Sequence, residues 1–166
     1  MMRTSAVAPA LGLAAFFAVL VPCPANAQTT LAISLGPAQY DLSDTGWSGA
    51  FGAHLQRAPR PWLRLDAGTG FFTYSPQFGD QVTMLLPEVG AAFQASGPVP
   101  IYLGIGLGHT VVVTGGQRNA ATAYSALGLS IPGRGGLAFR PELRVRLIDW
   151  GAAIAEYTMA LSYPVG

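Results

Sequence analysis

The segment from Leu137 to Ile148 alternates between apolar and charged side chains almost without exception. Successive side chains of a β-strand point to opposite faces, so such a segment has one apolar and one charged face. The apolar face holds Leu137, Phe139, Leu143, Val145 and Leu147, and the charged face holds Arg140, Glu142, Arg144 and Arg146. The pattern therefore predicts a strand between two environments, and it leaves open which face points into the protein.

The first 27 residues have the three parts of a secretory signal peptide. Arg3 supplies a positive start, residues 6–21 are apolar, and Ala25-Asn26-Ala27 forms a small-residue cleavage site. The apolar stretch is shorter than the roughly 20 residues that a transmembrane helix needs. We therefore expect residues 1–27 to be removed on export and residues 28–166 to form one domain. The single cysteine, Cys23, lies in the removed part, so we expect no disulfide.

The composition does not fit an ordinary soluble domain. Apolar residues make up 51% of the chain and charged residues only 10%, whereas about a quarter of a typical soluble domain is charged. Lysine is absent. Without Arg3, eight arginines remain against eight acidic residues, so the net charge of the remaining chain is close to zero. This balance leaves no basic patch for nucleic acid and no acidic tail. Such a chain would dissolve poorly behind a polar surface, which indicates a membrane although no spanning helix is evident.

Helical periodicity is nearly missing after residue 28, and eight strand-like runs can be read instead. The runs contain ten to fourteen residues, close to the roughly 9–11 that a tilted strand needs to cross a bilayer. The expected strands are residues 31–42, 46–57, 62–75, 82–95, 101–114, 122–131, 137–148 and 154–164.

The connections between these runs alternate in type. Tight turns rich in Pro and Gly are expected at 57–61, 96–100 and 132–136. The other connections are expected at 44–46, 76–81, 115–121 and 149–153, and they include Asp44, Asp80 and Asp149. If the tight turns are periplasmic, both ends of the chain lie on the periplasmic rim.

The same two faces recur in all eight runs. One parity is apolar throughout, while the other is too rich in glycine and too poor in lysine for a wet surface. It fits the narrow interior of a barrel whose apolar face meets lipid, because closure pairs every backbone group. We therefore predict an all-β, eight-stranded antiparallel up-and-down transmembrane β-barrel. The alternative is a soluble, lipid-binding barrel of lipocalin type, secreted or periplasmic, with the leucine face inside.

The last run, Tyr157-Thr158-Met159-Ala160-Leu161-Ser162-Tyr163, looks like the C-terminal assembly signal of outer-membrane barrels. With the signal peptide and the eight alternating runs, it makes the chain resemble the small outer-membrane β-barrel superfamily of OmpA/OmpX type. The resemblance implies a monomer in a Gram-negative outer membrane, with membrane lipids and the barrel-assembly machinery as partners. It also implies a structural role in envelope integrity or a role in surface contact, and a narrow channel is a further possibility.

The inward parity carries equal numbers of basic and acidic residues. Eight strands leave room only for side chains in the lumen, and buried charges persist when they are paired. We expect a structural ion-pair network rather than an arginine-lined pathway for ions. Its members are Arg64, Asp66, Glu88, Arg140, Glu142, Arg144, Arg146 and Glu156.

Two histidines raise the question of catalysis. Some small outer-membrane barrels are lipid-modifying enzymes or proteases, and a hydrolase would need His54 or His109 beside a nucleophile such as Ser48 or Ser125. No motif joins these residues, and two histidines without cysteine form no metal-binding pattern. We predict no catalytic residues, no metal site and no cofactor, and keep a lipid-modifying or proteolytic barrel as the alternative.

Aromatic residues and prolines complete the expectations. Aromatic side chains near strand ends are typical of a girdle at the bilayer interface. The expected girdle consists of Trp47, Trp62, Tyr74, Tyr102, Trp150 and Tyr163. Pro37, Pro87 and Pro141 fall inside expected strands, where each removes a hydrogen-bond donor, so they predict bulges or strand ends.

Overall fold

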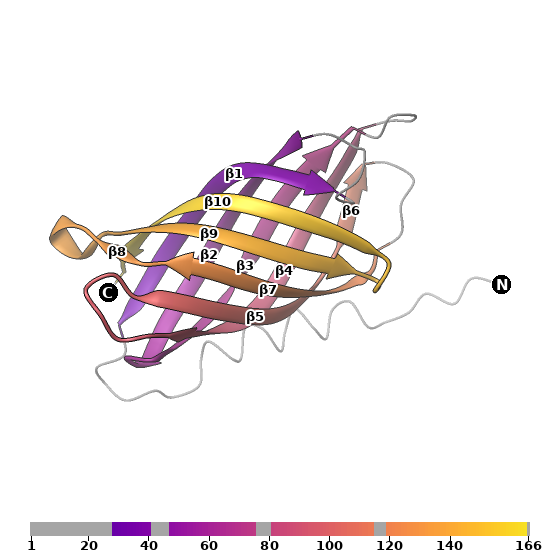
Figure 1. Cartoon of the computed structure of the whole chain (residues 1–166). Coiled ribbons are helices and arrows are strands. Elements are labelled where there is room, and N and C mark those ends of the chain that lie inside the picture. Colours follow the sequence, from indigo (N-terminus) through magenta and orange to yellow (C-terminus); the bar gives the residue numbers. More distant parts are fainter. Residues whose placement is uncertain (1–27, 41–46, 76–80, 115–118, 166) are drawn as a thin grey trace.

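The described residues form a closed antiparallel β-barrel (Figure 1). The computed structural model describes residues 28–40, 47–75, 81–114 and 119–165. The strands are β1 Thr29–Tyr40, β2 Trp47–Arg60, β3 Leu63–Tyr74, β4 Val82–Gln94, β5 Ile101–His109, β6 Val111–Thr114, β7 Ala121–Leu129, β8 Ile131–Pro132, β9 Ala138–Ile148 and β10 Ala152–Pro164. Chain neighbours pair around the sheet, and β10 pairs with β1 to close it. Within these residues no helix is long and apolar enough to cross a membrane.

The ten strands make up eight barrel strands, because β5 continues into β6 and β7 continues into β8. Gly108 of β5 pairs with Glu88, and Val111 of β6 pairs with Leu85, so the register against β4 is the same on both sides of the interruption, and it shifts only further along, between Met84 and Thr83. Pro87 lies opposite the interruption and has no N–H to donate across it. On its other side Pro87 pairs with Thr69 without disturbance.

Pro141 has the same effect on the other broken strand. Gly128 of β7 pairs with Glu142, and Ile131 of β8 pairs with Phe139, again in one register against β9. Toward β10 the pairing of Pro141 with Met159 is regular. Pro37 likewise pairs with Gly49 of β2, although the paired residues of β1 and β10 skip it. The expected bulges and strand ends are therefore wrong, since each proline opens the ladder on one side and leaves the register intact.

One rim of the barrel holds both ends of the described chain and the tight turns (Figure 1). Thr30 pairs with Pro164, and the N–H of Val165 donates to the carbonyl of Thr29 at 2.9 Å. We call this the chain-end rim. The turn expected at 57–61 is shorter than predicted, because β2 bulges between Arg57 and Arg60 and remains a strand to Arg60.

The opposite rim holds one connection that the structure describes in full, whereas the expected Asp44 and Asp80 lie outside the described residues. The described connection is a two-residue hairpin turn made by Asp149 and Trp150, whose φ angles are 47° and 57°. Positive φ at both central residues defines the type I′ turn that suits twisted antiparallel strands. The N–H of Gly151 closes the turn by donating to the carbonyl of Ile148 at 3.0 Å.

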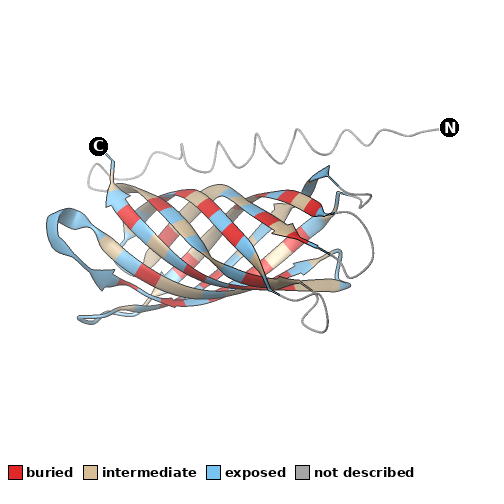
Figure 2. Cartoon of the chain, turned by 90° about the horizontal axis from the view of Figure 1, so that it is seen from above, coloured by how far each residue is buried: buried red, intermediate tan, exposed pale blue. Residues whose placement is uncertain are grey.

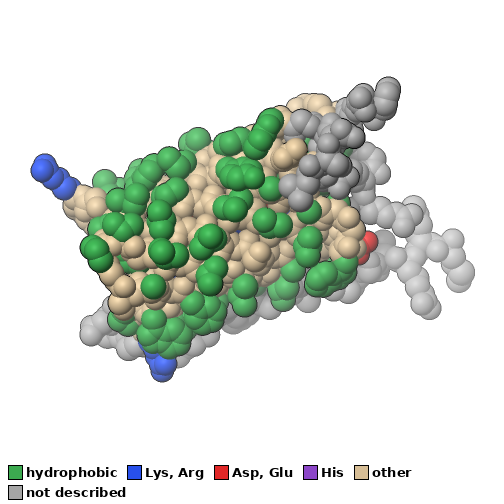
Figure 3. Space-filling view, viewed as in Figure 1, with side chains coloured by type: hydrophobic (Ala, Val, Ile, Leu, Met, Phe, Trp, Pro, Cys, Tyr) green, Lys and Arg blue, Asp and Glu red, His purple; other side chains and the backbone are tan. Residues whose placement is uncertain are grey.

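The leucine parity faces outward on every strand. Exposed and buried residues alternate along the strands (Figure 2), and large apolar side chains such as Leu35, Leu103 and Leu107 are more than 60% exposed. Apolar side chains cover the middle of the visible face, whereas the charged ones lie at its two ends (Figure 3). The lipocalin-type alternative, with this parity inside, is therefore wrong. The predicted barrel is confirmed, and each expected strand boundary lies within three residues of the observed one.

Glycines on the inward parity make room for two tyrosine rings. A Cβ at Gly106 would overlap the ring of Tyr124 and the carbonyl oxygen of Val89, and one at Gly128 would overlap the ring of Tyr102. Both tyrosines are buried in the lumen. Gly106 of β5 and Gly128 of β7 therefore make room for aromatic rings in the lumen.

Adding a methyl group at one of these glycines is expected to destabilise the barrel. We predict that Gly106→Ala lowers the free energy of unfolding in detergent micelles by about 1–3 kcal/mol, because overpacking displaces Tyr124. Gly49→Ala is the matched control, since a Cβ there meets no atom within 4 Å. Equal stabilities of the two variants would contradict the packing role of Gly106.

Introducing an arginine at two depths along the barrel wall tests whether the leucine parity faces outward. Leu143 lies in the middle of β9 and Ile101 at the first residue of β5, and both side chains are exposed. We expect Leu143→Arg to cost about 2–4 kcal/mol and Ile101→Arg about 0–1 kcal/mol of unfolding free energy in lipid vesicles. Denaturant titration of both variants measures the difference, and equal costs would refute the assigned depth.

Candidate functional site

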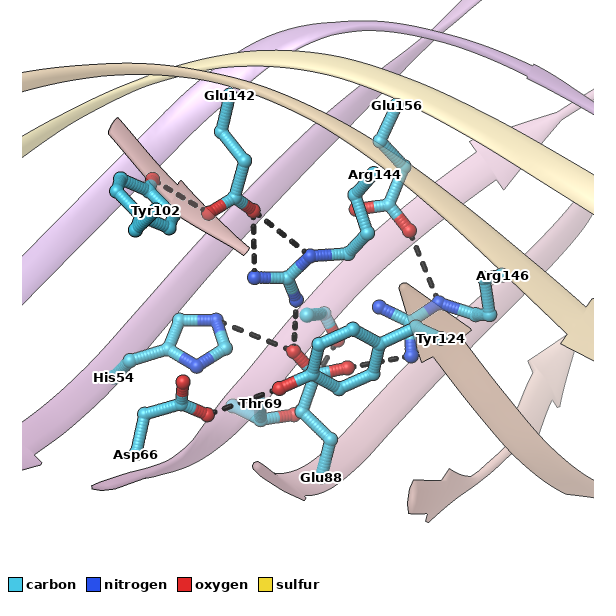
Figure 4. Close-up of polar contacts among 11 residues, drawn as sticks. His54, Asp66, Thr69, Glu88, Tyr102, Tyr124, Glu142, Arg144, Arg146 and Glu156 are labelled. Carbon is cyan, nitrogen blue, oxygen red and sulfur yellow. Dashed lines mark hydrogen bonds and ion pairs between the residues drawn. The ribbon is translucent and has the colours of Figure 1, made fainter. Parts of the chain in front are cut away.

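Glu88 of β4 lies at the centre of the charged lumen (Figure 4). It is 3% exposed, and one carboxylate oxygen accepts a hydrogen bond from Nη1 of Arg144. Its other oxygen lies 2.5 Å from Nη1 of Arg146, and Nε2 of His54 lies 3.7 Å from Oε1. One buried carboxylate thus faces two guanidinium groups and one imidazole.

Two further acids complete the pairing of these arginines. Glu142 accepts from Nε of Arg144 at 2.9 Å and lies 2.8 Å from its Nη2, while Nε of Arg146 donates to Glu156 at 3.0 Å. Arg144 and Glu156 are cross-strand partners on β9 and β10, so the register places these charges side by side. We call Glu88, Glu142, Arg144, Arg146 and Glu156 the central network.

Among the described residues no arginine forms an ion pair with Asp66 within 4.0 Å, contrary to the expectation of four ion-paired acids. It accepts instead from the hydroxyl of Tyr124 at 3.0 Å. The guanidinium groups of Arg144 and Arg146 lie over the ring of Tyr124, at 4.4 Å and 5.5 Å from its centroid. Tyr124 therefore links Asp66 to the central network through its ring and its hydroxyl.

Arg64 and Arg140 do not join the central network either. Nη1 of Arg140 donates to Oε1 of Gln56, and the guanidinium of Arg64 lies 4.3 Å from the ring centroid of Tyr102. In the described part of the chain no carboxylate oxygen lies within 4.0 Å of either arginine. The structure thus brings together five of the eight predicted network residues and leaves two cations without an acid.

The lumen toward the opposite rim is apolar, which the sequence analysis missed. Phe72, Met84, Leu86 and Ile154 are at most 2% exposed and pack in one cluster. The cluster is completed by Ala38, Ala50, Tyr74 and Val82, with Tyr40, Val112 and Ile148 packed against it. The signal was present, because Phe72, Met84 and Leu86 lie on the inward parity of β3 and β4.

Two residues of the expected aromatic girdle belong to the lumen instead. Tyr74 is 3% and Tyr102 2% exposed, since both fall on the inward parity. The ring of Tyr74 stacks on Tyr40 at 4.2 Å within the apolar cluster, and the hydroxyl of Tyr102 donates to Glu142 at 2.7 Å. The girdle prediction is wrong for these two, whereas the remaining members are exposed: Trp47, Trp62, Trp150 and Tyr163.

Comparison with solved structures finds the same architecture. Neisserial surface protein A (NspA) aligns with a TM-score of 0.62 at 12% identity, over 84% of this chain and 97% of that one. The N-terminal β-barrel domain of Pseudomonas aeruginosa OprF aligns with a TM-score of 0.58 at 15% identity, over 83% of this chain and 100% of that one. Ail, the attachment invasion locus protein of Yersinia pestis, aligns at 0.55 and 12% identity, over 84% and 99%. This chain has the fold of the small outer-membrane β-barrels.

Sequence comparisons add no closer relationship to this small-barrel fold. No family model matches the chain, and no curated protein matches it. At identities of 12–15% the structural likeness establishes the transmembrane barrel and nothing about activity.

Within the described residues, neither candidate nucleophile lies beside His54. His54 is buried and faces Glu88, whereas Ser125 is exposed on the outward parity. Ser48 lies six residues before His54 on the same strand, which separates them by roughly 20 Å at 3.3 Å per residue. His109 is only half-buried.

A small pocket beside the central network has room for about one water molecule. His54, Arg144, Arg146, Glu156 and Thr158 are among its lining residues. Among the described residues no group of three or more His, Cys, Asp and Glu side chains could hold a metal ion. The pocket suits a structural water rather than a substrate.

The central network predicts a large asymmetry between its acids. We expect Glu88→Gln to lower the unfolding free energy in micelles by about 3–5 kcal/mol, because Arg144 and Arg146 lose a shared buried counter-charge. The control is Glu142→Gln, which makes the same chemical change. It should lower the unfolding free energy less, because Arg144 keeps its ion pair with Glu88. A Glu88→Gln barrel as stable as the wild type would show that Glu88 does not anchor the network.

Proposed function

We propose that this protein is an integral barrel of a Gram-negative outer membrane with a structural or surface-contact role and no enzymatic activity. In this proposal residues 1–27 are a signal peptide and residues 28–166 are the mature protein. The observation that carries the proposal is a lumen filled by side chains behind an apolar exterior. A filled lumen offers neither a substrate cavity nor a continuous water path.

Two stacked layers support a lumen closed to solutes. The central network fills the middle with paired charges, and the apolar cluster around Phe72 and Ile154 lies between it and the opposite rim. Ions would have to cross a layer of mainly apolar side chains, where they would lose most of their hydration. We therefore disfavour the narrow-channel alternative.

The exterior supports a bilayer environment. Trp47 and Trp62 are exposed near opposite ends of β2 and β3, and Trp47 lies beside Tyr157 with ring centroids 5.7 Å apart. Amphipathic rings at both ends of an apolar band are typical of proteins in contact with lipid headgroups. Outer-membrane lipids are therefore the proposed partners of a monomeric barrel. The barrel-assembly machinery would act on the C-terminal strand β10.

Cell fractionation and gel electrophoresis test the proposed location. We expect the protein in the outer-membrane fraction, with different mobilities for boiled and unboiled samples because the closed barrel resists detergent. Recovery in the soluble periplasmic fraction without a heat shift would overturn the proposal. Reconstitution in planar bilayers then tests closure: we expect no steady conductance, and a stable open level would restore the channel alternative.

A further inference from the structure

Two buried arginines near the chain-end rim have no acidic partner. Arg64 of β3 is 6% exposed and Arg140 of β9 is 9% exposed. Gln56 accepts a hydrogen bond from Arg140 and is the cross-strand partner of Asp66, so it is the diagonal neighbour of Arg64. Gln56 thus connects the two arginines across this end of the lumen.

Several donors of this pair point at no acceptor. Nε and Nη1 of Arg64 and Nε of Arg140 are buried without a hydrogen-bond partner. The two nearest neutral groups make other contacts: Oε1 of Gln56 accepts from Nη1 of Arg140, and the hydroxyl of Tyr102 donates to Glu142. The ring of Tyr102 offers Arg64 only its face. These donors need an acceptor that no described side chain supplies within hydrogen-bond distance.

In the described part of the chain no acid lies within 4.0 Å of this pair, and Glu142 and Asp66 act on Arg140 only at longer range. Glu88, Glu142 and Glu156 are shared among Arg144 and Arg146, and Asp66 accepts from Tyr124. Two like charges out of water repel each other and carry a desolvation cost, which an anion between them would offset. Guanidinium groups present N–H donors in a planar fork that matches phosphate oxygens. A tetrahedral anion has oxygens in several directions, so it can face arginines from two opposite walls.

The chain-end rim is also the positive end of the barrel. Arg60 and Arg134 are exposed in its turns, and the visible Arg side chains in Figure 3 lie toward this end. Such a rim attracts anions toward the lumen entrance.

We propose that Arg64 and Arg140 form a binding site for a phosphate group, with Gln56 and Tyr102 as its neutral walls. Inorganic phosphate and the headgroup of an anionic phospholipid at the rim share this chemistry. The site adjoins the central network through Tyr102 but shares no residue with it, so its failure would leave the proposed structural role untouched.

Nitrogen-15 NMR of the arginine Nε–H groups tests the site directly. The full mature barrel is held in uncharged maltoside micelles and titrated with sodium phosphate, while sodium chloride keeps the ionic strength constant. We expect saturable shifts of the Arg64 and Arg140 signals, with smaller shifts for Arg144 and Arg146 in the central network. Shifts that are absent, or that chloride reproduces, would overturn the proposal.

Three substitutions that each remove one positive charge distinguish binding at the site from general attraction of anions to the rim. Arg64→Gln and Arg140→Gln should each weaken phosphate binding at least tenfold, and Arg134→Gln, an exposed residue of the same rim, should change it less than twofold. Both lumen variants should retain the heat shift of a folded barrel, because neither change strands a buried acid. If either variant fails to fold, the Nε–H titration of the wild-type protein and the other variant still test the phosphate site. Equal weakening by all three would overturn the site.

A second titration identifies the source of the phosphate group. Dihexanoyl phosphatidylglycerol replaces inorganic phosphate at the same ionic strength, and competition between the two is measured on the Arg140 signal. Shifts with the lipid alone assign a headgroup site, and shifts with inorganic phosphate alone assign a site for the free ion. Both results support the phosphate site, whereas no response to either ligand would overturn it.

Discussion

The constraint on which this structure depends is that hydrocarbon supplies no hydrogen-bond partners. A chain that crosses lipid as strands must pair every backbone N–H and carbonyl with another strand, and the pairing of β10 with β1 leaves no open edge. Closure also explains why the prolines are tolerated. Pro87 and Pro141 each lack a donor toward one neighbour, and they interrupt the ladder locally while the strands on both sides hold the register.

Closure with eight strands makes the lumen narrow, and the inward residues follow from that. Glycines on β5 admit the ring of Tyr124, and Tyr124 in turn contacts Asp66 and the arginines of the central network. A buried charge in this space needs an opposite charge in direct contact. Glu88 provides that contact for two arginines, Arg144 and Arg146. The apolar cluster needs no such pairing, so the two layers fill the same lumen by different physical means.

Much of this fold could be predicted from the sequence because lipid and lumen impose opposite chemistry on alternate residues. The period of two assigned Leu143 outward and Arg144 inward before any pairing was known. It could not say which inward residues share a depth, because depth depends on the stagger between strands. That is why Asp66 was expected to pair with an arginine although it bonds to Tyr124, and why Tyr74 was placed in the girdle although it stacks in the lumen.

The same limit explains why the pair of Arg64 and Arg140 was not visible as a separate feature. When the charges of the lumen are only counted, Arg64 and Arg140 are balanced by two acids. The three-dimensional contacts show that Glu88, Glu142 and Glu156 pair with other arginines. A structural role requires that each buried charge be offset where it lies, not merely in the sum over the lumen. The central network meets that condition with its own residues, whereas the chain-end pair has no described acid within 4.0 Å, and in the proposed site a bound anion supplies that charge. The barrel therefore combines a self-sufficient middle with an end whose charge balance depends on its surroundings.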